Sequence, residues 1–259
     1  DFNATAIHSS KWLNPKPGTD AALALGMVQT IVADGLVDWD YVREQTDLPF
    51  LVRTDNQKFL RASDFGETGY RADSTFYFWD ETTKKPVKAP GTNYGQAPGM
   101  PVAPREPEFL TLAGIKPAVE GRWKVKTPKG PVEVTTVFEL TKALCNREYT
   151  PEQVQKITGV HADNTRAVAR TFAKSKASMI YAGYRSCKWL HGDKLHRAWL
   201  LMCALTGNTG REGGGMQTTQ MSKGDGLAKF AFEGIGPRLK VAAISIRDYA
   251  TGDGKGLNR

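Results

Sequence analysis

The chain has 259 residues, which is long enough for one large or two small domains with a sizeable core. Hydrophobic residues make up 40% and charged residues 24%, a composition typical of a soluble globular protein. The net charge of +8 favours an anionic partner such as a phosphate group, an acidic subunit or nucleic acid. Because the lysines are scattered, a solvated basic surface accounts for most of them.

Cysteine usage and the chain ends narrow the class of protein further. Cys145, Cys187 and Cys203 have no CxxC spacing, which argues against a zinc or iron–sulfur site built by this chain alone, and their odd number argues against a disulfide scaffold. The apolar run 198–205 is too short for a bilayer, which needs about 20 residues. The chain starts with neither Met nor a signal sequence, so either a leader has been removed or, the favoured interpretation, the chain is an internal segment of a longer polypeptide.

Residues 1–45 are predicted to contain two helices. A Pro-Gly turn precedes Thr19 and Asp20, either of which is a suitable N-cap, and the alanine- and leucine-rich run 21–32 predicts a well-buried helix. A second, short helix is predicted over 38–45. An Asp at a helix start either caps the helix or reaches the N–H donors of a guanine or ribose, and the sequence alone favours the capping role.

Residues 46–145 are predicted to be a β-rich, loop-rich insertion. The stretches 123–127 and 132–137 alternate around a Pro-Lys-Gly-Pro turn and predict a β-hairpin. The aromatic cluster 76–79 is either a stacking platform for bases or the apolar anchor of a loop-rich segment, and the second interpretation is favoured. Other strand-like pieces lie at 50–53, 75–80 and 84–87, and the Pro- and Gly-rich stretch 89–107 predicts an extended surface excursion.

The remaining residues predict α/β layering. Helices are expected over 151–158, after a capping box at Thr150, and over 162–174. A buried strand is expected at 179–182, followed by a polar, aromatic loop and an amphipathic helix. That helix begins at Asp193 and is stopped by Gly207-Asn208. Beyond the glycine-rich turn, a short helix is predicted at 227–232 and a buried strand at 241–246.

The stretch 178–217 is the predicted functional centre. It has the layout of a nucleotide-binding half-unit, with a strand, a loop, a helix and a glycine-rich turn in that order. Ligands of such units lie at the carboxyl ends of the strands. The glycines allow positive φ and let the backbone come close to a phosphate.

Two separated motifs carry a family resemblance. Trp12-Leu13 followed by PGTDAAL at 17–23, and LTGNTGREGGG at 205–215, together resemble the catalytic subunit of the dimethyl sulfoxide reductase family of molybdopterin oxidoreductases. The segments YVREQTDLP, FYFWD and KWLHGD are similar to the branch with nitrate, selenate, chlorate and perchlorate reductases and with ethylbenzene and dimethyl sulfide dehydrogenases. The resemblance covers most of the chain, and both motifs with the KWLHGD segment between them make it fairly specific.

The resemblance implies a fold and a cofactor. It implies molybdenum, sometimes tungsten, held by two molybdopterin guanine dinucleotides, with an iron–sulfur cluster elsewhere in the full subunit. The expected fold class is α/β, with Rossmann-like dinucleotide-binding layers and a β-rich, loop-rich insertion. Residues 1–45 would end one cofactor-binding domain, 46–145 would be the insertion, and 146–259 would be the second cofactor-binding region.

The resemblance also implies site residues. Asp20 would hydrogen-bond a guanine in a pocket shaped by Gly18 and Thr19, and the loop 183–192 would pass close to a pterin and the metal. Asn208 and the glycines after it would lie against the cofactor or support the loop that does. Besides the residues at 18–20, the expected cofactor-binding residues are Gly183, Tyr184, Ser186, Trp189, Asn208, Gly210, Gly213, Gly214, Gly215 and Gln217.

Lys188 and His191 are the candidates for catalysis. A Lys could hold an oxyanion or stabilise developing negative charge, and a His could relay a proton near neutral pH. The alternatives are a solvent-exposed lysine at a loop tip and a histidine that caps the following helix. By resemblance the metal ligand is an Asp upstream of this chain, so no metal ligand is expected here and Cys187 is interpreted as a packing residue.

The implied function is two-electron oxygen-atom transfer or hydroxylation, with electrons passed to iron–sulfur centres. The expected partners are the missing parts of the same subunit, an iron–sulfur electron-transfer subunit and, as a further candidate, a haem subunit, in a periplasmic or membrane-associated location with a cytoplasm-facing one as the alternative. No nucleic-acid partner is expected, because no basic helix or aromatic-interleaved sheet supports one. The fragment alone is expected to be inactive. The competing hypothesis is a non-catalytic scaffold or assembly protein that keeps the dinucleotide-binding fold without the metal site.

Overall fold

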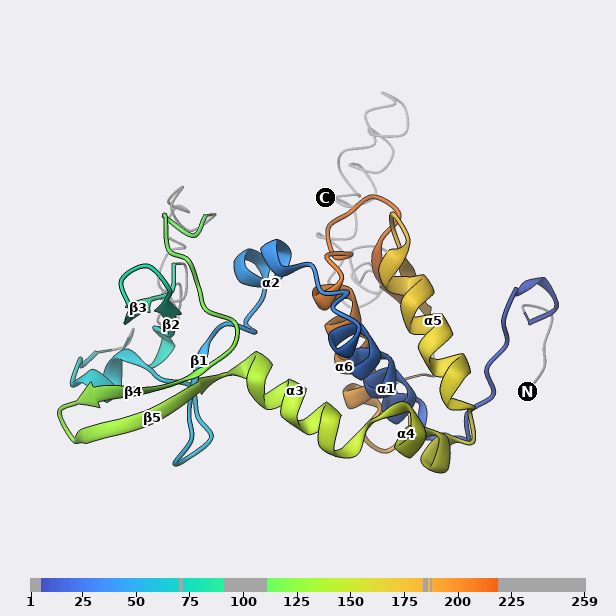
Figure 1. Cartoon of the computed structure of the whole chain (residues 1–259), viewed down its shortest axis with the longest axis horizontal. Helices are drawn as coiled ribbons and strands as arrows, with labels where there is room; N and C mark the ends of the chain where they lie inside the picture. Colours follow the sequence, from blue (N-terminus) through green and yellow to red (C-terminus); the bar gives the residue numbers. More distant parts are fainter. Residues whose placement is uncertain (1–5, 70–71, 91–110, 184–185, 187, 219–259) are drawn as a thin grey trace, which may run out of the picture. The chain divides into compact units, whose positions relative to one another are not determined.

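A computed structural model describes residues 6–69, 72–90, 111–183, 186 and 188–218. The chain divides into two units, 1–181 with 185–216 and 182–184 with 217–259, and nearly all of the described elements belong to the first. The α-helices are α1 (Asp20–Ala33), α2 (Trp39–Gln45), α3 (Val137–Glu148), α4 (Pro151–Thr158), α5 (Ala162–Lys174) and α6 (Gly192–Leu205) (Figure 1). The strands are β1 (Leu51–Arg53), β2 (Tyr77–Asp80), β3 (Lys85–Lys88), β4 (Arg122–Thr127), β5 (Gly130–Thr136), β6 (Met179–Ala182) and β7 (Gly215–Thr218), and short 3-10 turns lie at Ala6–His8, Ala62–Phe65 and Ala72–Ser74.

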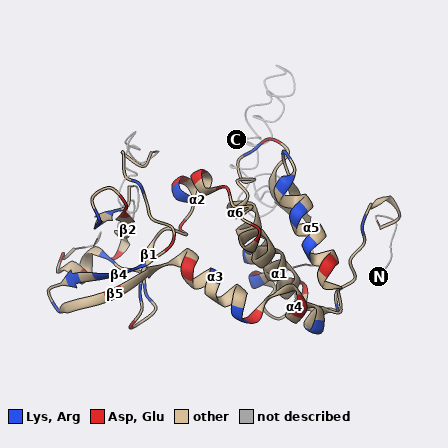
Figure 2. Ribbon diagram, viewed as in Figure 1, with Lys and Arg blue, Asp and Glu red and all other residues tan. Residues whose placement is uncertain are grey.

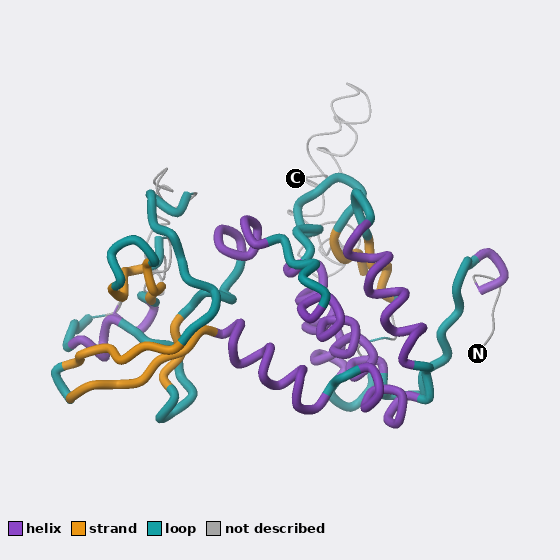
Figure 3. Tube along the Cα trace, in the orientation of Figure 1, coloured by secondary structure: helices purple, strands orange, loops and turns teal. Residues whose placement is uncertain are grey.

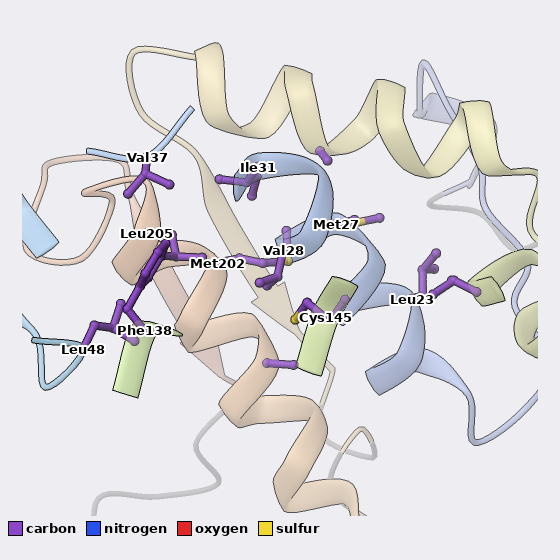
Figure 4. Packing of buried hydrophobic residues seen from close by; sticks show 14 of the residues in the cluster. Leu23, Met27, Val28, Ile31, Val37, Leu48, Phe138, Cys145, Met202 and Leu205 are labelled. Carbon is purple, nitrogen blue, oxygen red and sulfur yellow. The ribbon is translucent and has the colours of Figure 1, made fainter. Parts of the chain in front are cut away.

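Helix α1 is the centre of the helical core. It contacts α3, α4, α5 and α6, so apolar side chains on nearly every side of it can pack against another helix. Val28 and Ile31 are completely buried there, and each such side chain contributes about 1.5–3 kcal/mol to folding. Figure 4 shows the same core receiving side chains from α3 and α6, including Phe138 and Leu205.

Local signals set the helix ends as the sequence predicts. Helix α4 begins with the capping box of Thr150 and Gln153 and ends at Gly159, which has φ of 80°. Helix α5 spans the predicted residues, with Thr165 and Ala169 buried. Helix α2 begins after Asp38, whose carboxylate accepts the N–H of Tyr41 at 3.1 Å, so the capping interpretation of this Asp is confirmed.

Basic residues cover the outer side of α5, which Figure 2 shows as bands along the helix. Arg170 donates to Asp34 at 2.6 Å, and Arg166 pairs with Glu152. The hydrogen bond from Arg170 lowers the pKa of Asp34. Part of the positive charge therefore serves ion pairs between helices.

The β-rich part has its own small core. Strands β1, β5 and β4 form an antiparallel sheet in that order, and β4 and β5 make the predicted hairpin, which closes at Thr127 opposite Gly130 (Figure 3). The ring of Trp79 stacks on Trp123, with centroids 4.9 Å apart and planes within 12°. Tyr77 is buried beside these rings, which confirms the aromatic segment as an apolar anchor.

Helix α3 was not predicted, because its residues lie in the segment assigned to strands and loops. Strand β5 ends at Thr136, whose hydroxyl oxygen accepts the N–H of Glu139 at 3.1 Å and caps the new helix. Phe138 then enters the helical core and is completely buried. The predicted strand 132–137 therefore stops one residue early, because a cap and an apolar anchor follow it directly.

Strand β6 forms at the predicted residues, but the prediction that it is buried is wrong. The side chains of Met179 and Tyr181 are 51% and 69% exposed, and only Ala182 is buried. Among the described residues β6 is hydrogen-bonded to β7 alone. An apolar run therefore indicated the strand correctly without indicating what covers it.

The mixed helix and strand content agrees with the predicted α/β class. Every strand pair with a known register in the described part of the chain is antiparallel. Residues from the predicted first and third parts, 1–45 and 146–259, share one hydrophobic core, and the three-part division stays a prediction. The helix 227–232, the strand 241–246 and most of the excursion 89–107 lie outside the described residues. None of the helices within the described ranges has the length and apolar character that crossing a bilayer requires.

Candidate functional site

The glycine-rich turn, defined here as residues 207–215, uses glycine where other residues would be strained. Four of its glycines have φ between 61° and 90°, a region that disfavours side chains. The inside of the turn is crowded, since a Cβ on Gly214 would lie 2.5 Å from the carbonyl oxygen of Asn208. The outside is open, since a Cβ on Gly210 would meet no atom within 4 Å. The four positive-φ positions are Gly207, Gly210, Gly213 and Gly215.

Asn208 holds this turn from inside the protein. Its side-chain oxygen accepts the N–H of Ser178 at 2.8 Å, and its side-chain nitrogen donates to the hydroxyl of Thr206 at 2.8 Å. The residue is 1% exposed. Of the two predicted roles, contacting the cofactor or supporting the loop, these contacts are those of a supporting residue.

The turn lies at the amino end of β6. Ser178 directly precedes β6, and it contacts Asn208 and accepts the N–H of Gly215 at 3.1 Å. Ligands are expected at the carboxyl ends of strands, and the element at the carboxyl end of β6 is the β6–α6 loop, not this turn. This loop is residues 183–191, of which Gly183, Ser186 and 188–191 are described.

The start of α2 also fastens the glycine-rich turn. The hydroxyl of Tyr41 donates to the carbonyl oxygen of Thr209 at 3.0 Å. The N–H of Asp38 donates to the carbonyl oxygen of Leu205 at 2.8 Å. Arg211 donates to the carbonyl oxygen of Lys176 at 3.1 Å and lies 3.8 Å from the Asp38 carboxylate. Helix α2 and the segment before β6 thus fix the turn on two sides.

The PGTD motif forms an open turn at the start of α1. Gly18 has φ of 82° and is exposed, and a Cβ there would meet nothing within 4 Å. Thr19 occupies the N-cap position, but its hydroxyl donates back to the carbonyl oxygen of Lys16 at 2.6 Å and makes no capping bond. The prediction of a side-chain cap by Thr19 is therefore wrong, because its ψ of 9° departs from the extended conformation of a capping residue. Asp20 begins the helix half-buried.

The structure separates these two motifs. Asp20 begins α1, whereas the glycine-rich turn contacts Asp38, beyond the other end of α1. A helix of 14 residues is roughly 20 Å long. The two predicted binding regions therefore form separate surfaces.

The β6–α6 loop carries the predicted catalytic residues. Lys188 is exposed, and so is the ring of Trp189 at 55%. His191 has φ of 60° at the N-cap position of α6, and its side chain makes no capping hydrogen bond. The capping alternative for His191 is thus not supported. The N–H of Gly192 donates to the carbonyl oxygen of Trp189 at 2.9 Å and closes the loop.

Four other positions that the sequence singled out carry little structural information. Gly183 is exposed and open, and Gln217 is exposed on β7. Tyr184 and Cys187 lie outside the described residues.

Burial raises the pKa of the Cys145 and Cys203 thiols to about 11, which disfavours the thiolate form that a metal would require. Among the described residues no cluster of three or more His, Cys, Asp or Glu side chains is arranged to hold a metal ion.

The family of the chain follows from its sequence match over this whole region. The profile of the molybdopterin oxidoreductase family matches residues 1–242. The chain belongs to this family. The match includes the PGTD turn, the β6–α6 loop and the glycine-rich turn.

Named relatives lie in the predicted branch of this molybdopterin oxidoreductase family. The perchlorate reductase alpha subunit of Dechloromonas aromatica is 40% identical over 227 residues, which cover 83% of this chain and 24% of that protein. The dimethylsulfide dehydrogenase alpha subunit of Rhodovulum sulfidophilum is 38% identical over 248 residues, or 94% and 25%. The chlorate reductase alpha subunit of Ideonella dechloratans is 39% identical over 213 residues, or 82% and 21%. The chain thus spans about a quarter of the length of these relatives.

Two cavities of this family member are lined by none of the predicted site residues, although the second is lined by Ser178, which is hydrogen-bonded to Asn208. One of about 310 Å³ is lined by the end of α2 with Phe50 and Phe78. One of about 670 Å³ lies between residues 8–11 and the end of α5. Neither is lined by a residue of the PGTD turn, the β6–α6 loop or the glycine-rich turn.

Sequence reasoning missed the residues that fasten the site. Tyr41, Arg211 and Ser178 hold the glycine-rich turn, and His196 contacts Ser186 at 2.7 Å. Arg211 lies inside a recognised motif, which was a usable signal. The other contacts join residues 10 to 168 positions apart in the sequence, and no local sequence pattern predicts them.

Proposed function

We propose that the chain is part of the catalytic subunit of a molybdenum oxidoreductase, in which this segment binds the molybdopterin guanine dinucleotides. The reaction would be two-electron oxygen-atom transfer or hydroxylation, with electrons passed to iron–sulfur centres in the rest of the enzyme. The observation that carries the proposal is the family match over 1–242. The position of the β6–α6 loop at the carboxyl end of a strand supports it, because ligands of α/β sheets bind there.

The residues at the PGTD turn suit a guanine. The Asp20 carboxylate makes no hydrogen bond or ion pair within the described ranges, so it is available to accept the N–H groups of a base. The backbone at Gly18 is open, and no side chain blocks an approaching ligand. Asp20 is thus the proposed guanine ligand, and Gly18 and Thr19 shape its surroundings.

The β6–α6 loop suits the reacting end of the cofactor. When bound, the cofactor supplies a metal centre that exchanges two electrons with the substrate. The ammonium group of Lys188 would hold an anionic substrate or stabilise negative charge as it develops. His191 would accept or donate a proton near neutral pH. Trp189 would offer an aromatic face, with Gly183, Ser186 and Tyr184 as further contacts.

We assign the glycine-rich turn a mainly supporting role. Asn208 is buried and Gly214 faces the protein interior, whereas Gly210 and Gly213 are exposed. Contact with the cofactor is therefore proposed for Gly210, Gly213 and the following Gln217, whereas Asn208, Gly214 and the buried Gly215 shape the turn.

The finer features implied by the family remain part of this proposal. They are the Rossmann-like layering, completed by further segments, and the division at residues 45 and 145. They also include an iron–sulfur partner subunit, a haem subunit as a further candidate, and a periplasmic or membrane-associated location. The relatives named above are alpha subunits, which supports an assembly of several subunits.

The test uses the complete polypeptide produced under anaerobic conditions. We expect about one molybdenum atom per chain and release of GMP on acid hydrolysis. With reduced methyl viologen as electron donor and chlorate, perchlorate and nitrate as probes, Lys188→Ala should lower kcat/KM for the accepted probe about 100-fold. The matched control is Lys194→Ala, an exposed lysine in the first turn of α6. A native polypeptide that releases GMP and holds no molybdenum would favour the scaffold alternative, and absence of both would refute the proposal.

A further inference from the structure

A hydrogen bond between two side chains attaches the β6–α6 loop to α6. Ser186 Oγ lies 2.7 Å from His196 Nε2. Ser186 lies within the loop, and His196 lies on α6 one turn after the helix begins. The contact therefore links the part of the loop before Lys188 to a residue of a packed helix.

His196 is itself held in place from the other side. Its ring stacks on that of Trp199, with centroids 5.6 Å apart and planes within 23°. Residues three positions apart on a helix lie on one face, so this contact is local and persistent. Trp199 packs against the helical core, and the neighbouring Ala198 is buried in it. The position of the imidazole is thus set by the core.

We propose that His196 is a positioning residue that holds the β6–α6 loop through Ser186 and so sets the placement of Lys188 and His191. This inference rests on the proposed function, which assigns those two residues to the reaction. The loop has a second fixed point at its other end, where the N–H of Gly192 donates to the carbonyl oxygen of Trp189 at 2.9 Å. Lys188 lies between the two fixed points.

The chemistry of the contact favours restraint of the loop. A serine hydroxyl donates to a neutral imidazole nitrogen or accepts from a protonated one, so the bond survives either charge state. A glutamine at 196 carries its terminal polar atoms at a similar reach and can keep the bond, whereas alanine cannot. Loss of one such hydrogen bond should raise the population of the released loop about fivefold.

The first readout is limited trypsin digestion of the complete polypeptide, followed by mass spectrometry of cleavage after the exposed Lys188. His196→Ala and Ser186→Ala should each speed this cleavage about fivefold, the double variant should be no faster than either, and His196→Gln should stay near wild type. Arg197→Gln, an exposed neighbour on α6, is the matched control. Unchanged cleavage in both alanine variants would overturn the restraint.

The second readout separates positioning from mere stability. In the viologen assay, kcat should fall at least fivefold in His196→Ala and recover in His196→Gln, while the melting temperature and the molybdenum content of both variants stay unchanged. Faster cleavage with unchanged kcat would overturn the positioning role. A wild-type polypeptide without molybdenum would refute the proposed function, and the cleavage ratio would still decide whether His196 restrains the loop.

Discussion

The side-chain oxygen of Asn208 accepts the backbone N–H of Ser178 at 2.8 Å, across 30 residues of sequence. This one contact joins the turn after α6 to the residue that directly precedes β6. It places the glycine-rich turn at the amino end of β6 and leaves the carboxyl end to the β6–α6 loop. The most recognisable motif of the chain therefore serves largely to support the structure, and the proposed chemistry lies at the other end of the strand.

Asn208→Ala should destabilise the fold by about 2–3 kcal/mol, because it leaves the part-buried N–H of Ser178 without its acceptor and removes the hydrogen bond that the Thr206 hydroxyl accepts. Urea unfolding followed by far-UV circular dichroism measures the loss. Asn56→Ala is the control, since the Asn56 side chain accepts the N–H of Lys58 at 3.0 Å on the surface and should cost less than about 0.5 kcal/mol. Equal effects at both positions would contradict the supporting role of Asn208.

Gly207→Ala should cost about 3 kcal/mol. At φ of 61° the added Cβ is strained and would lie 2.4 Å from the Asp38 carboxylate oxygen. Asp38 cannot move aside freely, because its carboxylate caps α2. Gly35→Ala has a similar φ of 66° with nothing within 4 Å of the Cβ, so it should cost only about 1 kcal/mol of backbone strain. Thermal melts of both variants test the difference. A smaller drop in melting temperature for Gly207→Ala than for Gly35→Ala would show that the start of α2 moves to accommodate the added Cβ.

The sequence predicts those features of the fold that nearby residues determine. Helix α4 follows from its capping box and its final glycine, and the β4–β5 hairpin from alternation around a turn. Helix α3 was missed, because only Phe138 and Cys145 of its residues are buried, and because the β-branched run of β5 continues directly into its first residue. The exposure of β6 was missed, because an apolar run does not say which elements cover it.

For the site, the sequence named candidate segments and could not say how they are arranged in space. The residues of the PGTD turn and of the glycine-rich turn were named, yet their separation by the length of α1 depends on how helices pack. Thr19 has the residue type of a cap and the wrong ψ for it. His196 carries no signal in the sequence, because its importance depends on a contact with Ser186 that only the folded loop creates.

Cys145 and Cys203 should resist thiol reagents in the native protein. Burial raises the pKa of both thiols to about 11, so little reactive thiolate exists at pH 8. The disulfide reagent DTNB should label at most one of the three cysteines before unfolding and all three in urea. An unfolded thiol has a pKa of about 8.5, so above this pH the unfolded chain loses protons that the folded chain keeps. The free energy of unfolding should therefore fall as the pH rises from about 8.5 towards 11. Rapid labelling of two or three thiols in the native state would contradict this burial.

The stability of the β-rich part should depend on the ionisation of Asp80 at acidic pH. The hydroxyl of Thr83 at 2.8 Å and the N–H groups of Lys116, Thr82 and Thr83 lower the pKa of Asp80 to about 2, against the opposing effect of burial. An unfolded Asp has a pKa of about 3.9, so the carboxylate stabilises the fold fully above about pH 4 and loses this effect as the pH falls towards 2. Asp80→Asn should lower the melting temperature at pH 7 and flatten its decline between pH 4 and 2. Asp40→Asn, an exposed carboxylate on α2, should leave both unchanged, and a steep acid decline that persists in Asp80→Asn would assign the effect to other carboxylates.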